Sequence, residues 1–235
     1  MNANKLISLE EFLDKKRDFS YLLVHLTRSD EFFSAKEILR AMLNERTLRA
    51  YNPFCIYKND LEKPQNALLR EEFKVVCFTE TPIDQIDALL QTLDGRQNQP
   101  EPYGLVFKKK YIREKGGNPV FYVTKKFAKP LGQLYDTQKK LPDSEVCRLL
   151  ALISVCEEGN DWHWEREWRI VGDLHFNYAD IYCGLCPEDE VGCFRNSFEE
   201  VPFIDPMWRP KQLLDELVKR TPRKPIELEP DDIPF

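Results

Sequence analysis

The sequence contains no run of apolar residues approaching the roughly 20 that a helix needs to cross a lipid bilayer. Its charged N-terminal segment, 1–17, lacks the apolar core that export signals carry. Its seven cysteines, an odd number in mostly hydrophobic contexts, do not suggest a disulfide framework, and no internal repeat is visible. These absences predict a cytoplasmic protein that makes no contact with a membrane.

An excess of positive charge is also missing, since the net charge is -6 and the pI is near 5.3. This balance argues against a protein that coats nucleic acid non-specifically. Between Lys108 and Lys129, however, eight basic residues stand against one acidic residue, Glu114, a local charge of about +7. The segment either faces a phosphate-bearing ligand or forms a solvated sheet edge that resists aggregation. The sequence leaves both interpretations open.

Length and composition are those of an ordinary globular protein. The chain has 235 residues, of which 42% are hydrophobic and 31% charged, enough to bury one substantial core. We expect a single α+β domain over 1–220, followed by a proline-rich, acidic C-terminal tail over 221–235.

The spacing of apolar residues predicts both helices and strands. Ser34 and Glu37 form a capping box before residues at helical spacing, so we expect a helix over 34–44. A similar box at Ser8 and Glu11 predicts a short N-terminal helix. Other patterns predict helices at 83–93, 143–155 and 206–220, a loop at 51–65, and strands at 21–27, 47–50, 75–81, 103–107, 119–123, 173–178 and 181–183.

This order of elements predicts a mixed α+β fold, built on a split, mainly antiparallel β-sheet core with flanking helices.

The tryptophan-rich segment 162–171 alternates apolar rings with ionisable groups, the pattern of a half-buried strand. On such a strand Glu165 and Glu167 share a face with His163 and Arg169. Carboxylates this close need a neutralising partner, or one of them acquires a raised pKa, and such groups concentrate at functional sites. The alternative is an edge strand with a solvated face, its glutamates balanced by nearby arginines.

Cys183 and Cys186 form a C-x2-C pair, and Cys193 follows it. A structural zinc site needs four ligands, and such pairs often supply two of them. A second pair is missing, so distant residues such as Cys55 or His175 would have to complete the set. The other interpretation is buried, reduced thiols.

Five segments, taken in order, resemble the AbiGi family of abortive phage-resistance proteins. They are LVHLTR (23–28), CFTETP (77–82), YGLVFK (103–108), PVFY (119–122) and WEREWR (164–169). More distantly the same series is similar to the ADP-ribosyltransferase superfamily. That resemblance implies an ADP-ribosyltransferase-like fold and NAD as the substrate.

The resemblance also implies roles for particular residues. Breaking the nicotinamide–ribose bond leaves an oxocarbenium-like sugar, which a nearby carboxylate stabilises. Glu167 is the first choice for this role and Glu165 the second, with His25 in the same catalytic set. The cofactor-binding residues would be His25 and Thr27 on the ribose and carboxamide, Thr79 in support of Glu167, Tyr103 or Phe107 stacked on nicotinamide, and Arg28, Lys108 and Lys109 on the pyrophosphate.

Two functions therefore stand as expectations. The first is a phage-defence protein that uses NAD to ADP-ribosylate a macromolecular acceptor, or that hydrolyses NAD. The alternative is a catalytically inactive, antitoxin-like regulator that binds a partner toxin or nucleic acid. Its expected contact residues are Lys108, Lys109, Lys110, Lys125 and Lys126. A metal-dependent nuclease is less favoured, because arginines compete with a metal for the two glutamates, and no metal is expected.

Overall fold

The computed structural model describes residues 20–51, 57–92, 99–156, 163–209, 211–213 and 215–216. The expected N-terminal helix and the tail at 221–235 lie outside these residues, as do Cys55 and Trp162. The helix expected at 206–220 starts too early, because 206–209 are not helical; 211–213 and 215–216 are helical, and the rest of that range lies outside the described residues.

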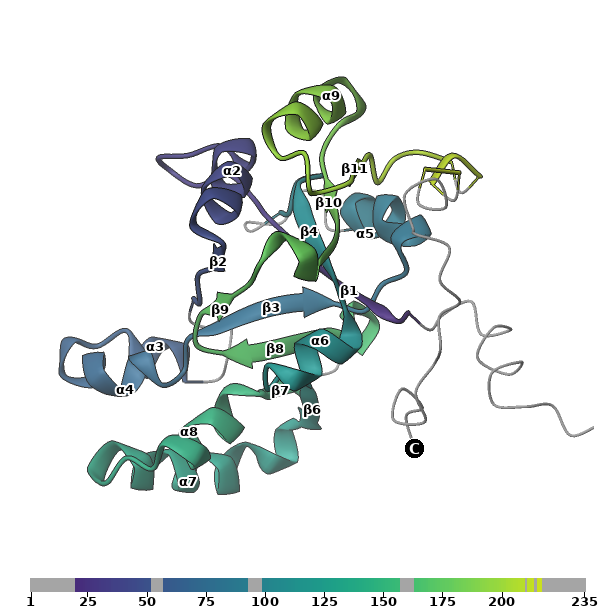
Figure 1. Cartoon of the computed structure of the whole chain (residues 1–235). Helices are drawn as coiled ribbons and strands as arrows, with labels where there is room; N and C mark the ends of the chain where they lie inside the picture. Colours follow the sequence, from purple (N-terminus) through teal and green to yellow (C-terminus); the bar gives the residue numbers. More distant parts are fainter. Residues whose placement is uncertain are drawn as a thin grey trace, which may run out of the picture.

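A seven-stranded sheet forms the centre of the described structure, with the strand order β11-β10-β4-β1-β3-β8-β5 (Figure 1). All neighbouring pairs are antiparallel except β10 and β11. The prediction of a mainly antiparallel sheet with flanking helices is therefore confirmed. The strands are β1 (Leu22–Leu26), β3 (Val75–Thr79), β4 (Gly104–Lys108), β5 (Asn118–Pro119), β8 (Glu167–Val171), β10 (Ile181–Leu185) and β11 (Phe203–Ile204).

Two small sheets accompany the large one. Strand β2 (Thr47–Leu48) pairs with β9 (Leu174–His175), and β6 (Phe121–Thr124) pairs in parallel with β7 (Ile153–Cys156). The helix predicted at 143–155 is wrong in its last part. Helix α8 (Ser144–Ala151) ends before β7, whose β-branched residues pair with β6 instead of continuing the helix.

Helix α2 (Ala35–Glu45) confirms the capping box. The Ser34 hydroxyl accepts a hydrogen bond from the Glu37 backbone N–H, and the Glu37 carboxylate accepts one from the Ser34 backbone N–H. The predicted helix at 83–93 is present as the 3-10 turn η2 (Ile83–Gln85) followed by α5 (Ile86–Thr92).

The predicted loop at 51–65 is wrong in its second half, and several helices are not anticipated by the apolar patterns. Helix α7 shows why, because it contains Pro130 and Gly132 and buries only Tyr135 and Gln138 on its inner face. The unanticipated elements are α3 (Lys58–Leu61), η1 (Pro64–Asn66), α4 (Ala67–Glu71), α6 (Lys109–Glu114), η3 (Lys125–Phe127), α7 (Ala128–Lys140) and α9 (Glu188–Ser197).

The helices cover the sheet in groups. In Figure 1, α7 and α8 lie side by side near β6 and β7, whereas α2 and α9 lie at the opposite end of the molecule. The largest core cluster packs Phe107 and Trp168 against α2 and α9, while Val106 packs on the other face against α5. None of the helices in the described parts of the chain is long and apolar enough to span a membrane.

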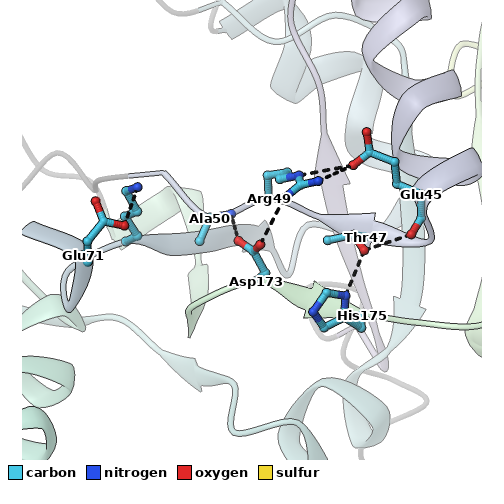
Figure 2. Close-up of polar contacts among 8 residues, drawn as sticks. Glu45, Thr47, Arg49, Ala50, Glu71, Asp173 and His175 are labelled. Atoms are coloured by element: carbon cyan, nitrogen blue, oxygen red, sulfur yellow. Dashed lines mark hydrogen bonds and ion pairs between the residues drawn. The ribbon is translucent and has the colours of Figure 1, made fainter.

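Polar contacts fasten β2 to β9 (Figure 2). The Asp173 carboxylate accepts a hydrogen bond of 2.7 Å from the backbone N–H of Ala50. The Thr47 hydroxyl donates to the carbonyl of Glu45 at 3.0 Å and lies 2.9 Å from Nδ1 of His175. Because this hydroxyl has one proton, His175 must donate to Thr47 from Nδ1. We interpret this network as structural, since it satisfies the backbone and side chains at a sheet edge.

Candidate functional site

The register of the central strands decides which predicted site residues meet. Val24 pairs with Thr79, and Thr79 pairs with Glu167, so these three residues share one face of the sheet. His25 points to the other face, where its ring meets the edge of the Phe78 ring at 5.7 Å. The structure therefore joins Thr79 to Glu167 but places His25 and Glu167 on opposite faces.

His25 has a structural partner on its own face. Its Nδ1 lies 2.7 Å from the carbonyl oxygen of Cys77, which can only accept, so Nδ1 carries the proton. Desolvation by burial lowers the pKa of His25, although the hydrogen bond to Cys77 opposes the shift. The neutral imidazole is therefore favoured at pH 7.

Thr79 contacts the backbone of Glu165 and lies beside Glu167, both in the WEREWR motif. Its hydroxyl donates to the carbonyl oxygen of Glu165 at 2.8 Å and lies 2.8 Å from the hydroxyl oxygen of Thr81. Its strand neighbour across the β3–β8 pair is Glu167. Two motifs 86 residues apart thus converge on this hydroxyl.

The prediction of one continuous strand over 162–171 is wrong before Glu167. Residues His163–Glu165 form the 3-10 turn η4, and β8 begins at Glu167. Arg166 has φ of 46°, a left-handed conformation that interrupts the alternation of faces. Glu165 and Glu167 are consequently not neighbours on one strand face.

Glu167 is held by Arg169. Its two carboxylate oxygens accept hydrogen bonds from Nε and Nη2 of Arg169, both at 2.8 Å. Arg169 is 2% exposed and also donates to the carbonyl of Ala151 at 2.8 Å. Desolvation disfavours its charge, but the Glu167 carboxylate outweighs this and raises the pKa of Arg169. The neutralising partner that the sequence required is therefore a two-point ion pair.

Two side chains to which the sequence patterns gave no role, Tyr122 and Cys156, contact His163 on the N-terminal side of the WEREWR segment. The Tyr122 ring on β6 lies 4.7 Å from the His163 ring, and Sγ of Cys156 on β7 lies 3.8 Å from Nδ1 of His163. Desolvation, together with the charges of Glu167 and Glu165, raises the pKa of Tyr122. The β6–β7 pairing that brings these residues together joins strands far apart in sequence, so no local pattern signals it.

Cys77 lies on the same face of the sheet as Glu167. Cys77 lies opposite Arg169 on the central strand β3, and its side chain is exposed. Protein atoms crowd its thiol nevertheless, and this desolvation, with the charge of Glu167, raises the pKa of Cys77 well above its usual value. The exposure at Cys77 does not extend to the ion pair beside it, since the side chains of Glu167 and Arg169 are only 17% and 3% exposed.

Several of the residues predicted to bind the cofactor make contacts within the protein core. Thr27 is buried and donates its hydroxyl to the carbonyl of Ala35 at 3.2 Å, and Phe107 lies fully within the core. Tyr103 packs at the edge of that core. Arg28 is exposed. The structure does not gather these residues around Glu167.

The predicted basic segment divides into separate parts. Lys109 is 6% exposed, and its Nζ lies 2.6 Å from Oε1 of Glu80, so it is not available to a phosphate as expected. Lys108 and Lys110 are exposed near α6, whereas Lys125 and Lys126 are exposed on the η3 turn.

The cysteines of the C-x2-C pair lie in different environments. Cys183 packs in the cluster beneath α5, and Cys186 packs in the larger cluster on the other face. Burial raises the pKa of both thiols, that of Cys186 to about 12. Cys193 is exposed and accepts a contact from Nη2 of Arg40 at 3.2 Å. Within the described residues no group of three or more His, Cys, Asp or Glu side chains is placed to hold a metal ion.

Comparisons of the chain with models of protein families, with curated proteins and with solved structures found no significant match.

Proposed function

We propose that the chain is a phage-defence protein that acts on NAD at a site centred on Glu167. It either transfers ADP-ribose from NAD to a macromolecular acceptor or hydrolyses NAD. The observation that carries this proposal is that Thr79 lies beside Glu167 on one face of the sheet and also donates its hydroxyl to the backbone carbonyl of Glu165. These residues come from two of the five motifs that resemble the AbiGi family and, more distantly, the ADP-ribosyltransferases.

The arrangement suits a reaction in which positive charge develops on a sugar. Arg169 fixes the orientation of the Glu167 carboxylate, so little reorganisation is needed when that charge appears. Thr79 lies beside Glu167 on the same face of the sheet, and its hydroxyl is a hydrogen-bonding group for a ribose. In this proposal Glu167 stabilises the transition state, and His25 serves the packing of the opposite face.

Nicotinamide release from NAD by the purified chain tests the proposal. Glu167→Gln is expected to lower turnover by about 100-fold or more, the usual effect of losing a preorganised electrostatic group. Thr79→Val, which removes a hydroxyl without changing the volume greatly, should lower it as well. The matched control is Glu145→Gln, since Glu145 is an exposed α8 residue.

Thermal unfolding of each variant shows whether lost turnover reflects lost structure. If the wild-type chain neither binds nor consumes NAD, or if folded Glu167→Gln retains full turnover, the proposed NAD chemistry is wrong.

A second candidate function, a regulator that binds nucleic acid, is favoured by the surface of η3. Phe127 is 56% exposed there, Phe121 on the preceding strand is 50% exposed, and Lys126 and Lys129 are exposed close by in sequence. Aromatic rings that stack on bases, combined with lysines that follow the backbone, are typical of proteins that bind single-stranded nucleic acid.

Fluorescence anisotropy with a single-stranded oligonucleotide checks this candidate. Phe127→Ala is expected to weaken binding about tenfold, because stacking on one base contributes about 1–3 kcal/mol. Lys126→Glu should weaken binding too and reduce its salt dependence. Lys140→Glu, at the far end of α7, is the control; equal losses in all three variants would contradict a localised site.

A further inference from the structure

Cys156 and His163 form a thiol–imidazole pair beside, but separate from, the Glu167–Arg169 ion pair. Cys156 ends β7 and His163 begins η4, and the 3.8 Å between Sγ and Nδ1 is within the range of a sulfur hydrogen bond. Cys156 is partly exposed and His163 is exposed, so reagents in solution can reach the sulfur. A thiol that can pass its proton to an imidazole reacts as the nucleophilic thiolate.

The immediate surroundings hold the imidazole in place. The Tyr122 ring packs against His163 with an interplanar angle of 45°. The Tyr122 hydroxyl is buried near the backbone of Glu167.

We propose that Cys156 is a reactive cysteine, activated by His163, and that it is a site of covalent modification by low-molecular-weight disulfides. His163 takes the proton of the Cys156 thiol at Nδ1, and the thiolate attacks one sulfur of the disulfide. A new sulfur–sulfur bond forms to Cys156 as the original one breaks. The departing thiolate then takes the proton from the imidazolium, and the disulfide is the oxidant.

The other cysteines among the described residues provide contrasts within the same chain. Cys77 adjoins Glu167, whose charge, after desolvation, disfavours its thiolate. Cys147, Cys183 and Cys186 are buried. Cys193 is exposed and contacts Arg40 but no imidazole among the described residues, so it serves as the reference for an accessible thiol without a histidine partner.

Reaction of the native chain with 5,5′-dithiobis(2-nitrobenzoic acid), with each site identified by mass spectrometry, tests the inference. Cys156 is expected to react first, about tenfold or more faster than Cys193. His163→Gln should remove this advantage and leave the Cys193 rate unchanged. In guanidinium chloride the difference between the two cysteines should vanish, because it depends on the fold.

His163→Phe provides a second variant that keeps an aromatic ring against Tyr122 but cannot accept a proton. Slow reaction of Cys156 in both folded variants supports the inference. A wild-type Cys156 that reacts no faster than Cys193, or a rate unaffected by both substitutions, overturns it. The assay contains no NAD, so its failure is distinguishable from failure of the proposed NAD chemistry.

Discussion

Replacing Arg169 with methionine is expected to lower the free energy of unfolding by about 3–5 kcal/mol, one of the two largest losses that we predict for a single substitution. The guanidinium is 2% exposed and makes a two-point ion pair with Glu167. Methionine fills much of its volume but leaves the partly buried carboxylate unpaired and the Ala151 carbonyl without its donor. Urea unfolding at neutral pH measures the loss.

The exposed ion pair between Arg148 and Glu145, 3.7 Å apart on α8, provides the control. Arg148→Met is expected to change stability by no more than about 1 kcal/mol, since water screens such pairs. If both arginine variants lose equal stability, the structural role of the buried pair is wrong. The double variant Glu167→Gln, Arg169→Met should recover part of the loss because no unpaired charge remains.

The second large effect is expected at Lys109, whose substitution by methionine should also cost about 3–5 kcal/mol. Its Nζ is 2.6 Å from Oε1 of Glu80, and both side chains are largely buried. The indole of Trp168 donates to Oε2 of Glu80 at 2.8 Å. Burial lowers the pKa of Lys109, and the hydrogen bond to Glu80 opposes this shift. Removing the lysine leaves a buried carboxylate with one neutral donor.

A double-mutant cycle separates this pair from general packing. In Glu80→Gln, Lys109→Met, the amide oxygen still accepts from the Trp168 indole, so the double variant should be more stable than Lys109→Met alone. We expect a coupling of about 2–3 kcal/mol from urea unfolding. The same cycle on Lys58 and Glu62, an exposed pair at 3.9 Å, should give almost none. Additive losses at Glu80 and Lys109 would contradict the proposed coupling.

Local patterns in the sequence were sufficient for several elements of the fold. The box at Ser34 and Glu37 correctly marked the start of α2, because capping depends on residues three apart. Short continuous runs of apolar residues correctly located the strands around Leu23 and Val76, since these residues pack on both faces of the sheet. Helix α7 was not predicted because its buried face is small and includes the polar residue Gln138.

The candidate site was predictable only in part. Glu167 and Thr79 were both identified from motifs, and the strand register makes them neighbours. His25 was assigned to the same set, but one step along a strand reverses the direction of a side chain. Glu165 was predicted on the strand face of Glu167 but lies in the η4 turn, because Arg166 adopts a left-handed conformation that residue type alone does not reveal.

The sequence by itself determined the mixed helix and strand content, the positions of the central strands and the presence of charged groups in the WEREWR motif. These features depend on neighbours within a few residues. Tertiary structure alone decided that Lys109 is buried against Glu80, that Arg169 holds Glu167 and that Cys156 meets His163. The physical reason is that side-chain partners follow from strand register and chain reversal, which bring distant segments together without a local signal.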